Sequence, residues 1–468
     1  MEKSNLVQTL QTLSKAEWRD FEKWLRSPAH NTSMEVVQLF LHLRGSLLAD
    51  SEHRRLVTTS VSSAISATQA EDTDHLHHLK SYLMKALEDF LLWSASSTDP
   101  ARRQQTLAIL FRQRNLGKLA RRAQRRAGDI QATAITRDQD YFEKNAKLEY
   151  ESIRLAEQEN TVQNHDLQPL LEAQDIRFIV EKLQTGCLLL SQQAVLPKPY
   201  DTGLLEPLLV FLEKHRYLEI PAVALYYYGY LAQLAPEQDT YFRRLKILLR
   251  EHGSLFQGEE LRNLYLLAIN FCIRRLNRLE RSYLREAFEL YQSGLEVGAF
   301  LQNGQLSRFT YTNIAQAGMG LREFAWVADF LEKHKKNLPP ELREPMSQFS
   351  LARLFYETGR PSEAMQCLLN VEHDDIIHNL AAKTLLAKIY FEQGELNALD
   401  SLLDSIAAYI RRKKVLGYHR DSYLSFVKIL RLLVSMDLTR TENRSNAREK
   451  IAAMKVLAER EWLGALVK

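Results

Sequence analysis

The feature that most constrains the fold is a pattern of large side chains, a small side chain and glycine that occurs twice, 35 residues apart. Large residues would fill the contact between two paired helices, a small residue would let their backbones approach, and glycine would close the turn at low steric cost. The pattern therefore predicts two consecutive helical hairpins. The first copy is Leu351, Ala352, Leu354, Phe355, Gly359 and Ala364, and the second is Leu386, Ala387, Ile389, Tyr390, Gly394 and Leu399.

Two further segments follow this pattern less closely. Residues 101–127 place Leu107, Ala108, Leu110, Phe111, Asn115 and Ala120 at the same spacings. Asn115 stands where the turn glycine would be, and asparagine tolerates a left-handed backbone better than most residues, so we expect such a backbone there. Gly320 precedes Ala325 by the same five residues that separate Gly359 from Ala364, which predicts another hairpin turn at Gly320.

The rest of the chain is also typical of helices. Ser14 followed by Glu17 predicts a capping box before a stripe of Trp18, Phe21 and Leu25. Ser445 would begin a last amphipathic helix that runs through to Leu466. No long run alternates with period two, so we expect no sheet. Residues 49–74 are polar with few large apolar side chains, and we expect them to be mobile or weakly packed.

Composition points to a protein of the cytoplasm. Hydrophobic residues make up 45% of the chain, as is ordinary for a folded protein. The formal charge is only +4, so any electrostatic function must be local. Cys187, Cys272 and Cys367 form no CxxC pair and are expected to be reduced core residues. The most apolar helix, at 222–235, is shorter than the about 20 residues that a bilayer requires. The first residues lack the pattern of a secretory signal.

Two segments resemble tetratricopeptide units: L-A-R-L-F-Y-E-T-G-R-P-S-E-A at 351–364 and L-A-K-I-Y-F-E-Q-G at 386–394. The phrase W-R-D-F-E-K-W-L-R-S-P at 18–28 and the whole layout are similar to a family of uncharacterised bacterial helical-repeat proteins. We therefore predict an all-α fold, a right-handed α-solenoid of tetratricopeptide-like helical hairpins with a helical N-terminal region. The expected divisions are the N-terminal region at 1–96, irregular hairpins at 97–300, tetratricopeptide-like repeats at 301–435 and a C-terminal capping helix at 436–468.

Motifs of catalysis are missing from the sequence. It has no GxxxxGK[ST] loop, no GxSxG elbow and no HExxH helix. Two sets of metal-ligand residues, Asp74 with His75 and His78, and Asp374 with Asp375 and His378, would each need a further ligand from elsewhere. We therefore expect no enzyme activity, metal or cofactor, and a metal-dependent enzyme is the remotest alternative.

A basic segment is the strongest charge anomaly. Between Arg102 and Arg126 there are nine basic residues and no Asp or Glu. The residues that would form a basic stripe on its second helix and the preceding turn are Arg114, Lys118, Arg121, Arg122 and Arg125. Three interpretations remain open: a solvated face neutralised by the acidic helix that follows, a binding surface for an acidic protein, or one for nucleic acid.

The resemblance to tetratricopeptide arrays also implies a concave groove lined by the first helix of each hairpin. The implied groove residues are Phe349, Arg353, Tyr356, Glu357, Thr384, Lys388, Phe391 and Glu392. Aromatic residues and arginine are frequent binding anchors, although Tyr356 and Phe391 could equally pack against a neighbouring helix. We expect a non-enzymatic scaffold or adaptor that holds a protein or peptide segment in this groove. Phe349 and Arg353 replace the Lys and Asn of a carboxylate clamp, so chaperone-tail binding is not implied.

Overall fold

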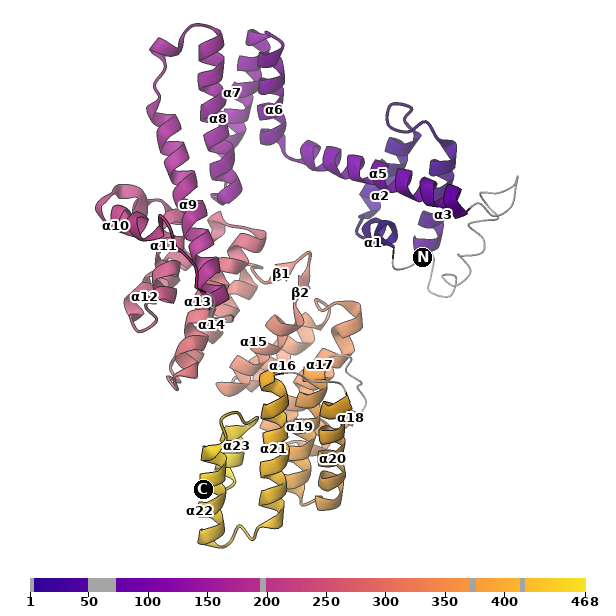
Figure 1. The fold of residues 1–468 in the computed structure, drawn as a ribbon, viewed down its shortest axis with the longest axis vertical. Helices are drawn as coiled ribbons and strands as arrows, with labels where there is room; N and C mark the ends of the chain where they lie inside the picture. Colours follow the sequence, from indigo (N-terminus) through magenta and orange to yellow (C-terminus); the bar gives the residue numbers. More distant parts are fainter. Residues whose placement is uncertain (1–3, 49–72, 194–198, 370–375, 413–416) are drawn as a thin grey trace. The chain divides into compact units, whose positions relative to one another are not determined.

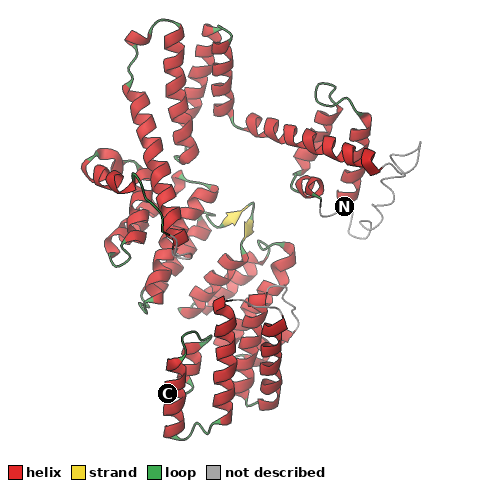
Figure 2. Cartoon of the chain, viewed as in Figure 1, coloured by secondary structure: helices red, strands yellow, loops and turns green. Residues whose placement is uncertain are grey.

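The computed structural model describes residues 4–48, 73–193, 199–369, 376–412 and 417–468, and about 80% of these residues are helical (Figures 1 and 2). This confirms the all-α class. Helices pack mostly against their neighbours in sequence, whereas the right-handed solenoid stays a prediction. None of the described helices is long and apolar enough to cross a membrane. The segment expected to be mobile, 49–74, lies almost wholly outside the described residues.

The chain forms two compact units. One comprises residues 1–135 and 140–177, and the other comprises residues 136–139 and 178–468. The helices of the first unit are α1 (Asn5–Gln11), α2 (Lys15–Arg26), α3 (Met34–Leu48), α5 (Thr73–Thr98), α6 (Pro100–Gln113), α7 (Gly117–Thr133), α8 (Gln139–Gln158) and the short 3-10 helix η2 (Val162–Asn164). Helix α9 (Gln168–Gln193) begins in the first unit and ends in the second.

Aromatic side chains fill the core of α1 to α5. Phe21 of α2 contacts Phe40 of α3 and Phe90 of α5, with ring centroids 5.0 and 5.2 Å apart. The predicted capping box begins α2: the Glu17 amide donates to Ser14 Oγ at 3.3 Å and the Ser14 amide donates to Glu17 Oε2 at 2.7 Å. The capping box and the apolar stripe of α2 are therefore both confirmed.

Glutamines and alanines hold α6 and α7 against α8. Ala120, Ala123 and Ala127 form the buried face of α7, and their small side chains allow close helix packing. Gln124 Nε2 donates to the Leu148 carbonyl at 2.6 Å, and Gln131 Nε2 donates to the Tyr141 carbonyl at 2.8 Å. Because these carbonyls belong to α8, the two glutamine side chains fix the position of α7 along the axis of α8.

The second unit continues in helical hairpins. Its helices are α10 (Leu205–Lys214), α11 (Pro221–Leu234), α12 (Asp239–His252), α13 (Gly258–Asn277), α14 (Tyr283–Glu296), α15 (Arg308–Gly320), α16 (Phe324–Lys335), α17 (Pro340–Glu357), α18 (Pro361–Leu369), α19 (Ile376–Gln393), α20 (Leu396–Arg412), α21 (Gly417–Ser435), α22 (Thr441–Ala453) and α23 (Arg460–Ala465). The 3-10 helices η3 (Arg216–Glu219) and η4 (Gly253–Leu255) lie among them. The hairpins α17–α18 and α19–α20 lie side by side, because Ala352, Ala364, Leu385 and Ile389 share one buried cluster.

Five hairpin turns, one in the first unit between α6 and α7 and four in the second unit, are closed by the same pair of backbone hydrogen bonds. The same pair also follows α8 at Asn160 and α14 at Gly298. After α17, the amide of Gly359 donates to the Tyr356 carbonyl at 3.1 Å and the amide of Arg360 donates to the Phe355 carbonyl at 2.8 Å. This is the Schellman arrangement, which needs a left-handed residue at the turn. The left-handed residues of the five hairpin turns are Asn115, Leu279, Arg322, Gly359 and Gly394, with φ between 59 and 74°. The turns predicted at Asn115, Gly359 and Gly394 are confirmed.

The turn predicted at Gly320 is two residues out of register. Gly320 is the last residue of α15, and Arg322 takes the left-handed backbone with φ of 61°. The glycines of α15 serve packing instead: a Cβ on Gly318 would lie 2.5 Å from Val327 Cγ2, and one on Gly320 would lie 3.0 Å from Leu284 Cδ2. Close helix contact, rather than turn geometry, explains them.

A small β-hairpin joins α14 to α15, against the expectation of no strands. Strand β1 (Leu301–Gln302) pairs antiparallel with β2 (Gln305–Leu306), with Leu301 opposite Leu306. Asn303 and Gly304 between them have φ of 50 and 77°, which suits the two-residue turn that Asn-Gly favours. The Asn-Gly pair was therefore a readable signal in the sequence.

The C-terminal segment forms two helices where the sequence predicted one. Helix α22 ends at Ala453, and α23 begins after Glu459, whose φ is 53°. The Arg460 guanidinium donates to the Ile451 carbonyl at 2.7 Å and also binds the Met454 carbonyl, so it satisfies the end of α22. The break lets Ile451, Leu463 and Val467 all reach the core shared with α19 to α21.

Candidate functional site

The structure places the predicted groove residues on α17 and α19, but few of them form an open surface. Phe349, Thr384 and Lys388 are buried, with 2 to 7% of each residue exposed. Arg353, Tyr356 and Phe391 are half-buried, and Glu357 and Glu392 are exposed. Three of the eight side chains therefore pack inside the protein.

The chain's own C-terminal segment covers this face. Lys388 Nζ lies 2.8 Å from Glu459 Oε2 and 4.8 Å from the centre of the Tyr356 ring. The Tyr356 hydroxyl donates to Glu392 Oε1 at 2.6 Å, and Trp462 Nε1 donates to the same oxygen at 2.7 Å. Burial, followed by the hydrogen bond to Glu392, raises the pKa of the Tyr356 hydroxyl. The C-terminal segment therefore contacts Lys388, Phe391 and Glu392 of the predicted groove, and the groove as a binding site stays a prediction.

An open cleft lies instead between α9, α11 and α13. Its volume is about 590 Å³, within the size range of small-ligand pockets. Helices α11 and α13 come first in the hairpins that they form with α12 and α14, the position that α17 and α19 hold in theirs. The sequence analysis named none of the cleft residues. Those used below are Gln139, Gln184, Leu188, Tyr226, Glu259, Asn263 and Asn270.

A saturated hydrogen-bond network forms the floor of this cleft. The Tyr226 hydroxyl donates to Glu260 Oε1 at 2.7 Å and accepts from Gln184 Nε2 at 3.2 Å. The backbone amide of Gln139 donates to Glu260 Oε2 at 3.1 Å. Burial raises the pKa values of both the Glu260 carboxyl and the Tyr226 hydroxyl. Because both oxygens of Glu260 already accept hydrogen bonds, the floor is a rigid support.

The wall of the cleft carries polar groups that are exposed. Asn263 and Asn270 stand seven residues apart on α13, about 10 Å along the helix axis. Within the described part of the chain, neither side-chain amide has a hydrogen-bond partner. An asparagine amide offers a donor and an acceptor together, as a peptide unit does. Leu188, which is 70% exposed, adds an apolar group.

The basic stripe is exposed on α7. Lys118, Arg121, Arg122 and Arg125 all face solvent, and Arg114, at the end of α6, donates to the Leu110 carbonyl at 3.1 Å. Arg121 alone of the α7 residues forms an ion pair among the described residues, 2.9 Å from Glu159. Ala120 and Ala123 are buried on the other side of the helix, whereas Leu119 is 43% exposed.

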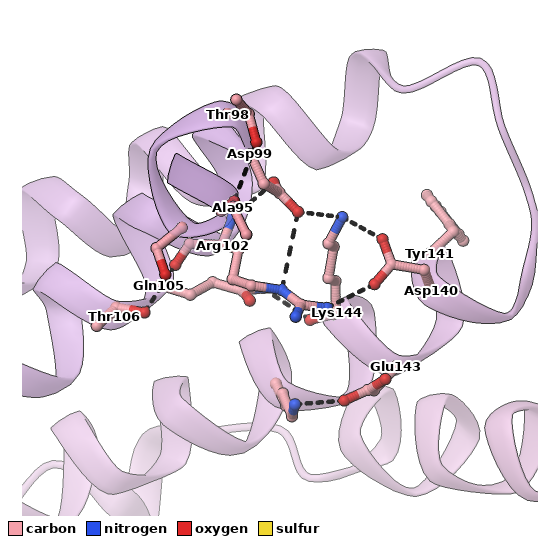
Figure 3. Close-up of polar contacts among 12 residues, drawn as sticks. Ala95, Thr98, Asp99, Arg102, Gln105, Thr106, Asp140, Tyr141, Glu143 and Lys144 are labelled. Carbon is pink, nitrogen blue, oxygen red and sulfur yellow. Dashed lines mark hydrogen bonds and ion pairs between the residues drawn. The ribbon is translucent and has the colours of Figure 1, made fainter. Parts of the chain in front are cut away.

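The acidic residues of α8 form ion pairs with basic residues of α6 and of α8 itself rather than with the basic stripe. Asp140 lies 2.7 Å from Arg102, and Lys144 forms ion pairs with both Asp140 and Asp99, at 2.6 Å from Asp99. Figure 3 shows these four side chains together. Glu151 pairs with Arg112 of α6 at 2.5 Å, with both side chains largely buried. Arg121 is the one residue of the stripe with an ion pair among the described residues, and its partner Glu159 directly follows α8.

The Asp99 cluster fixes the start of α6. Asp99 caps the helix by accepting from the Arg102 amide at 3.0 Å. Burial alone would raise the pKa of the Asp99 carboxyl, but the Arg102 amide and the Lys144 ammonium lower it below its ordinary value. Burial alone would lower the pKa of the Lys144 ammonium, but its hydrogen bonds to Asp140 and Asp99 raise it. This cluster has a structural role, holding α5 and α6 to the first turns of α8.

The cysteines lie where thiols are unreactive. Cys187 and Cys272 are buried, as expected, and Cys367 is partly exposed. Burial raises the pKa of Cys272 to about 12 and that of Cys187 further, so neither forms a thiolate readily. Among the described residues no three His, Cys, Asp or Glu side chains gather as metal ligands. The predicted sets remain untested, because the side chain of Asp74 and all of Asp374 and Asp375 lie outside the described residues.

No protein-family model matches the sequence, and no curated protein matches it significantly. The comparisons therefore identify no family for this chain.

Proposed function

We propose that the protein is a non-enzymatic scaffold that binds an extended segment of a partner protein in the cleft between α9, α11 and α13. The observation that carries this proposal is the pair of unpartnered amides, Asn263 and Asn270, on one wall of a cleft of about 590 Å³. Their spacing of about 10 Å suits two hydrogen bonds to the backbone of one extended chain, about three residues apart.

The other residues that line the cleft indicate which side chains the bound partner segment carries. Leu188 offers an apolar contact, while Glu259, which is exposed and lies 3.4 Å from Arg262, adds a carboxyl group that favours a basic side chain. The floor supports binding rather than catalysis, because the Tyr226 hydroxyl and both oxygens of Glu260 already have hydrogen-bond partners and the Cys187 thiol is buried. The preferred segment is thus one with an apolar residue beside Lys or Arg.

Site-specific photo-crosslinking in the full chain tests this function. A photoreactive residue at position 188 should give a discrete adduct with one partner, identified by mass spectrometry. Asn263→Ala with Asn270→Ala should reduce that adduct at least several-fold without changing the helical circular dichroism. Leu279, which is 83% exposed in a turn, provides the control position. The same adduct from position 279, or an adduct that survives both Asn substitutions, would reject the cleft as the binding site.

A further inference from the structure

The outward face of α7 carries positive charge that no part of the described chain neutralises. Lys118, Arg122, Arg125 and Arg126 are exposed, and no carboxylate of the described residues lies within ion-pair distance of them. Asp129, the nearest carboxylate in sequence, forms no ion pair among the described residues, and three acidic residues farther along pair with other arginines: Asp140 with Arg102, Glu151 with Arg112 and Glu159 with Arg121. A local positive potential therefore persists on a chain whose total charge is only +4.

These charges lie in a row with helical spacing. Lys118, Arg122 and Arg125 are separated by four and three residues, so they share one face and follow each other at about 6 and 4.5 Å along the axis. The row spans about two turns, and Asp129 on the next turn is acidic and exposed. A complementary ligand would therefore present negative groups at the same short spacing.

An exposed leucine of α7 lies to one side of the row. Leu119 is 43% exposed and stands one turn before Arg122. A surface that pairs a basic row with apolar side chains suits an amphipathic ligand better than a purely charged one. Helix α7 contains no aromatic residue, so it lacks the stacking platform of single-stranded nucleic acid sites.

We infer that this face of α7 binds an acidic amphipathic helix of a partner protein. The partner helix carries Glu or Asp at positions i, i+4 and i+7 against Lys118, Arg122 and Arg125, and apolar side chains on its flank against Leu119. This surface belongs to the first unit, so its function is independent of the cleft between α9, α11 and α13.

Binding of two synthetic peptides to the full chain tests the inference. One peptide is a helix with Glu at i, i+4 and i+7 beside a leucine flank, and the other has the same composition with the glutamates spread around the helix. Fluorescence anisotropy at low salt should give at least tenfold tighter binding of the first peptide. Equal binding of both peptides would overturn the inference, because it would show attraction by net charge alone.

Charge reversal locates the surface. Lys118→Glu with Arg122→Glu and Arg125→Glu should weaken binding of the patterned peptide at least tenfold. The matched control reverses Lys214, Arg244 and Arg278, which are exposed, form no ion pair among the described residues and give the same change of net charge. The Gln versions of the α7 substitutions should also weaken binding, and they provide the test if the Glu variant does not fold. Equal losses in the α7 and control variants would overturn the inference.

Two further measurements separate an amphipathic helix from other ligands. Leu119→Ala should weaken binding of the patterned peptide several-fold, and unchanged affinity would contradict an apolar contact at this surface. Single-stranded and duplex oligonucleotides should bind more weakly than the patterned peptide at 150 mM salt. An oligonucleotide that binds more tightly, and loses affinity on reversal of the α7 charges, would identify nucleic acid as the ligand instead.

Discussion

Leu279 closes the turn between α13 and α14 with a left-handed backbone, φ of 67°, and a side chain that is 83% exposed. A side chain with a Cβ is disfavoured in this conformation, whereas glycine adopts it freely. The two hydrogen bonds of the turn, from the amides of Leu279 and Glu280 to the carbonyls of Leu276 and Arg275, hold the residue there. Leucine at this turn therefore costs stability that its exposed side chain does not recover.

Replacing Leu279 by glycine should stabilise the protein. Because little packing is lost, Leu279→Gly should raise the free energy of local unfolding of α13 and α14 by about 1 kcal/mol. Native-state hydrogen exchange of the amides at the end of α13 measures it. Leu279→Ala, which keeps the Cβ, serves as the control and should change little. A glycine variant that exchanges faster than the wild type would contradict this explanation of the turn.

Asp99 should make the first unit sensitive to acid. The hydrogen bonds that lower its pKa favour the folded state only while the carboxyl is ionised. Its stabilising effect is therefore present above the ordinary aspartate pKa of about 3.9 and is lost as pH falls through the lower folded-state pKa. Asp99→Asn, which can still cap α6, should cost about 0.5–1 kcal/mol at pH 7.

The pH dependence gives the decisive comparison for Asp99. The difference in thermal stability between the wild type and Asp99→Asn should shrink steadily below pH 4. Asp99→Ala should cost more than Asp99→Asn at every pH, because it also removes the helix cap. A difference that stays constant from pH 7 to pH 2 would show that the charge of Asp99 contributes nothing.

At the scale of elements, the sequence predicted helix ends and turns where the side chain or backbone preference of a single residue favours the geometry. Ser14 with Glu17 marks a helix start, and Asn115 a turn, because their own side chains or backbone preferences favour that geometry. The turn at Arg322 could not be predicted, since arginine has no such preference and the glycines two and four residues before it serve packing. The break before α23 was equally hidden, because no glycine or proline accompanies Glu459.

Glu459 should be essential to the attachment of α23. Its removal leaves the Lys388 ammonium, whose side chain is only 9% exposed, without a carboxylate. We expect Glu459→Gln to lower the free energy of opening of α19 by about 1–3 kcal/mol. Adding Lys388→Met should recover part of the loss, since the buried charge is then gone. Hydrogen exchange of the α19 amides reports both effects.

Glu461 provides the control for this pair. Its side chain is 81% exposed and its only ion pair among the described residues is with the exposed Arg281, so Glu461→Gln should change stability by less than about 0.5 kcal/mol. If Glu459→Gln proved equally harmless, or if Lys388→Met added to its loss, the ion pair would not be what fastens the C-terminal segment.

At the scale of the whole molecule, sequential packing should limit how far a local defect spreads. Leu10 is fully buried in the core of α1 to α5, so Leu10→Ala should cost about 2–5 kcal/mol there. Because helices pack mostly on their neighbours in sequence, protection of α11 to α21 should not change. Hydrogen exchange resolved along the chain measures both regions, and a matching loss in both would reveal one cooperative unit.

This scale also explains why the candidate site could not be predicted. The cleft joins Leu188, Tyr226 and Asn270, which come from three helices and obey no common spacing in the sequence. The groove predicted on α17 and α19 depended on a resemblance to open arrays, and nothing in the residues of those helices revealed that Glu459 and Trp462 would cover them. The exposed row on α7 was predictable, because one helix alone determines it.

The five hairpin turns of the Schellman type have a consequence for tracing ancestry. A search profile that demands glycine at the turn would register Gly359 and Gly394 and pass over Asn115, Leu279 and Arg322. A template written in dihedral angles and amide-to-carbonyl links would register all five. Common ancestry among hairpins of this kind is therefore easier to detect from main-chain geometry than from amino-acid sequence.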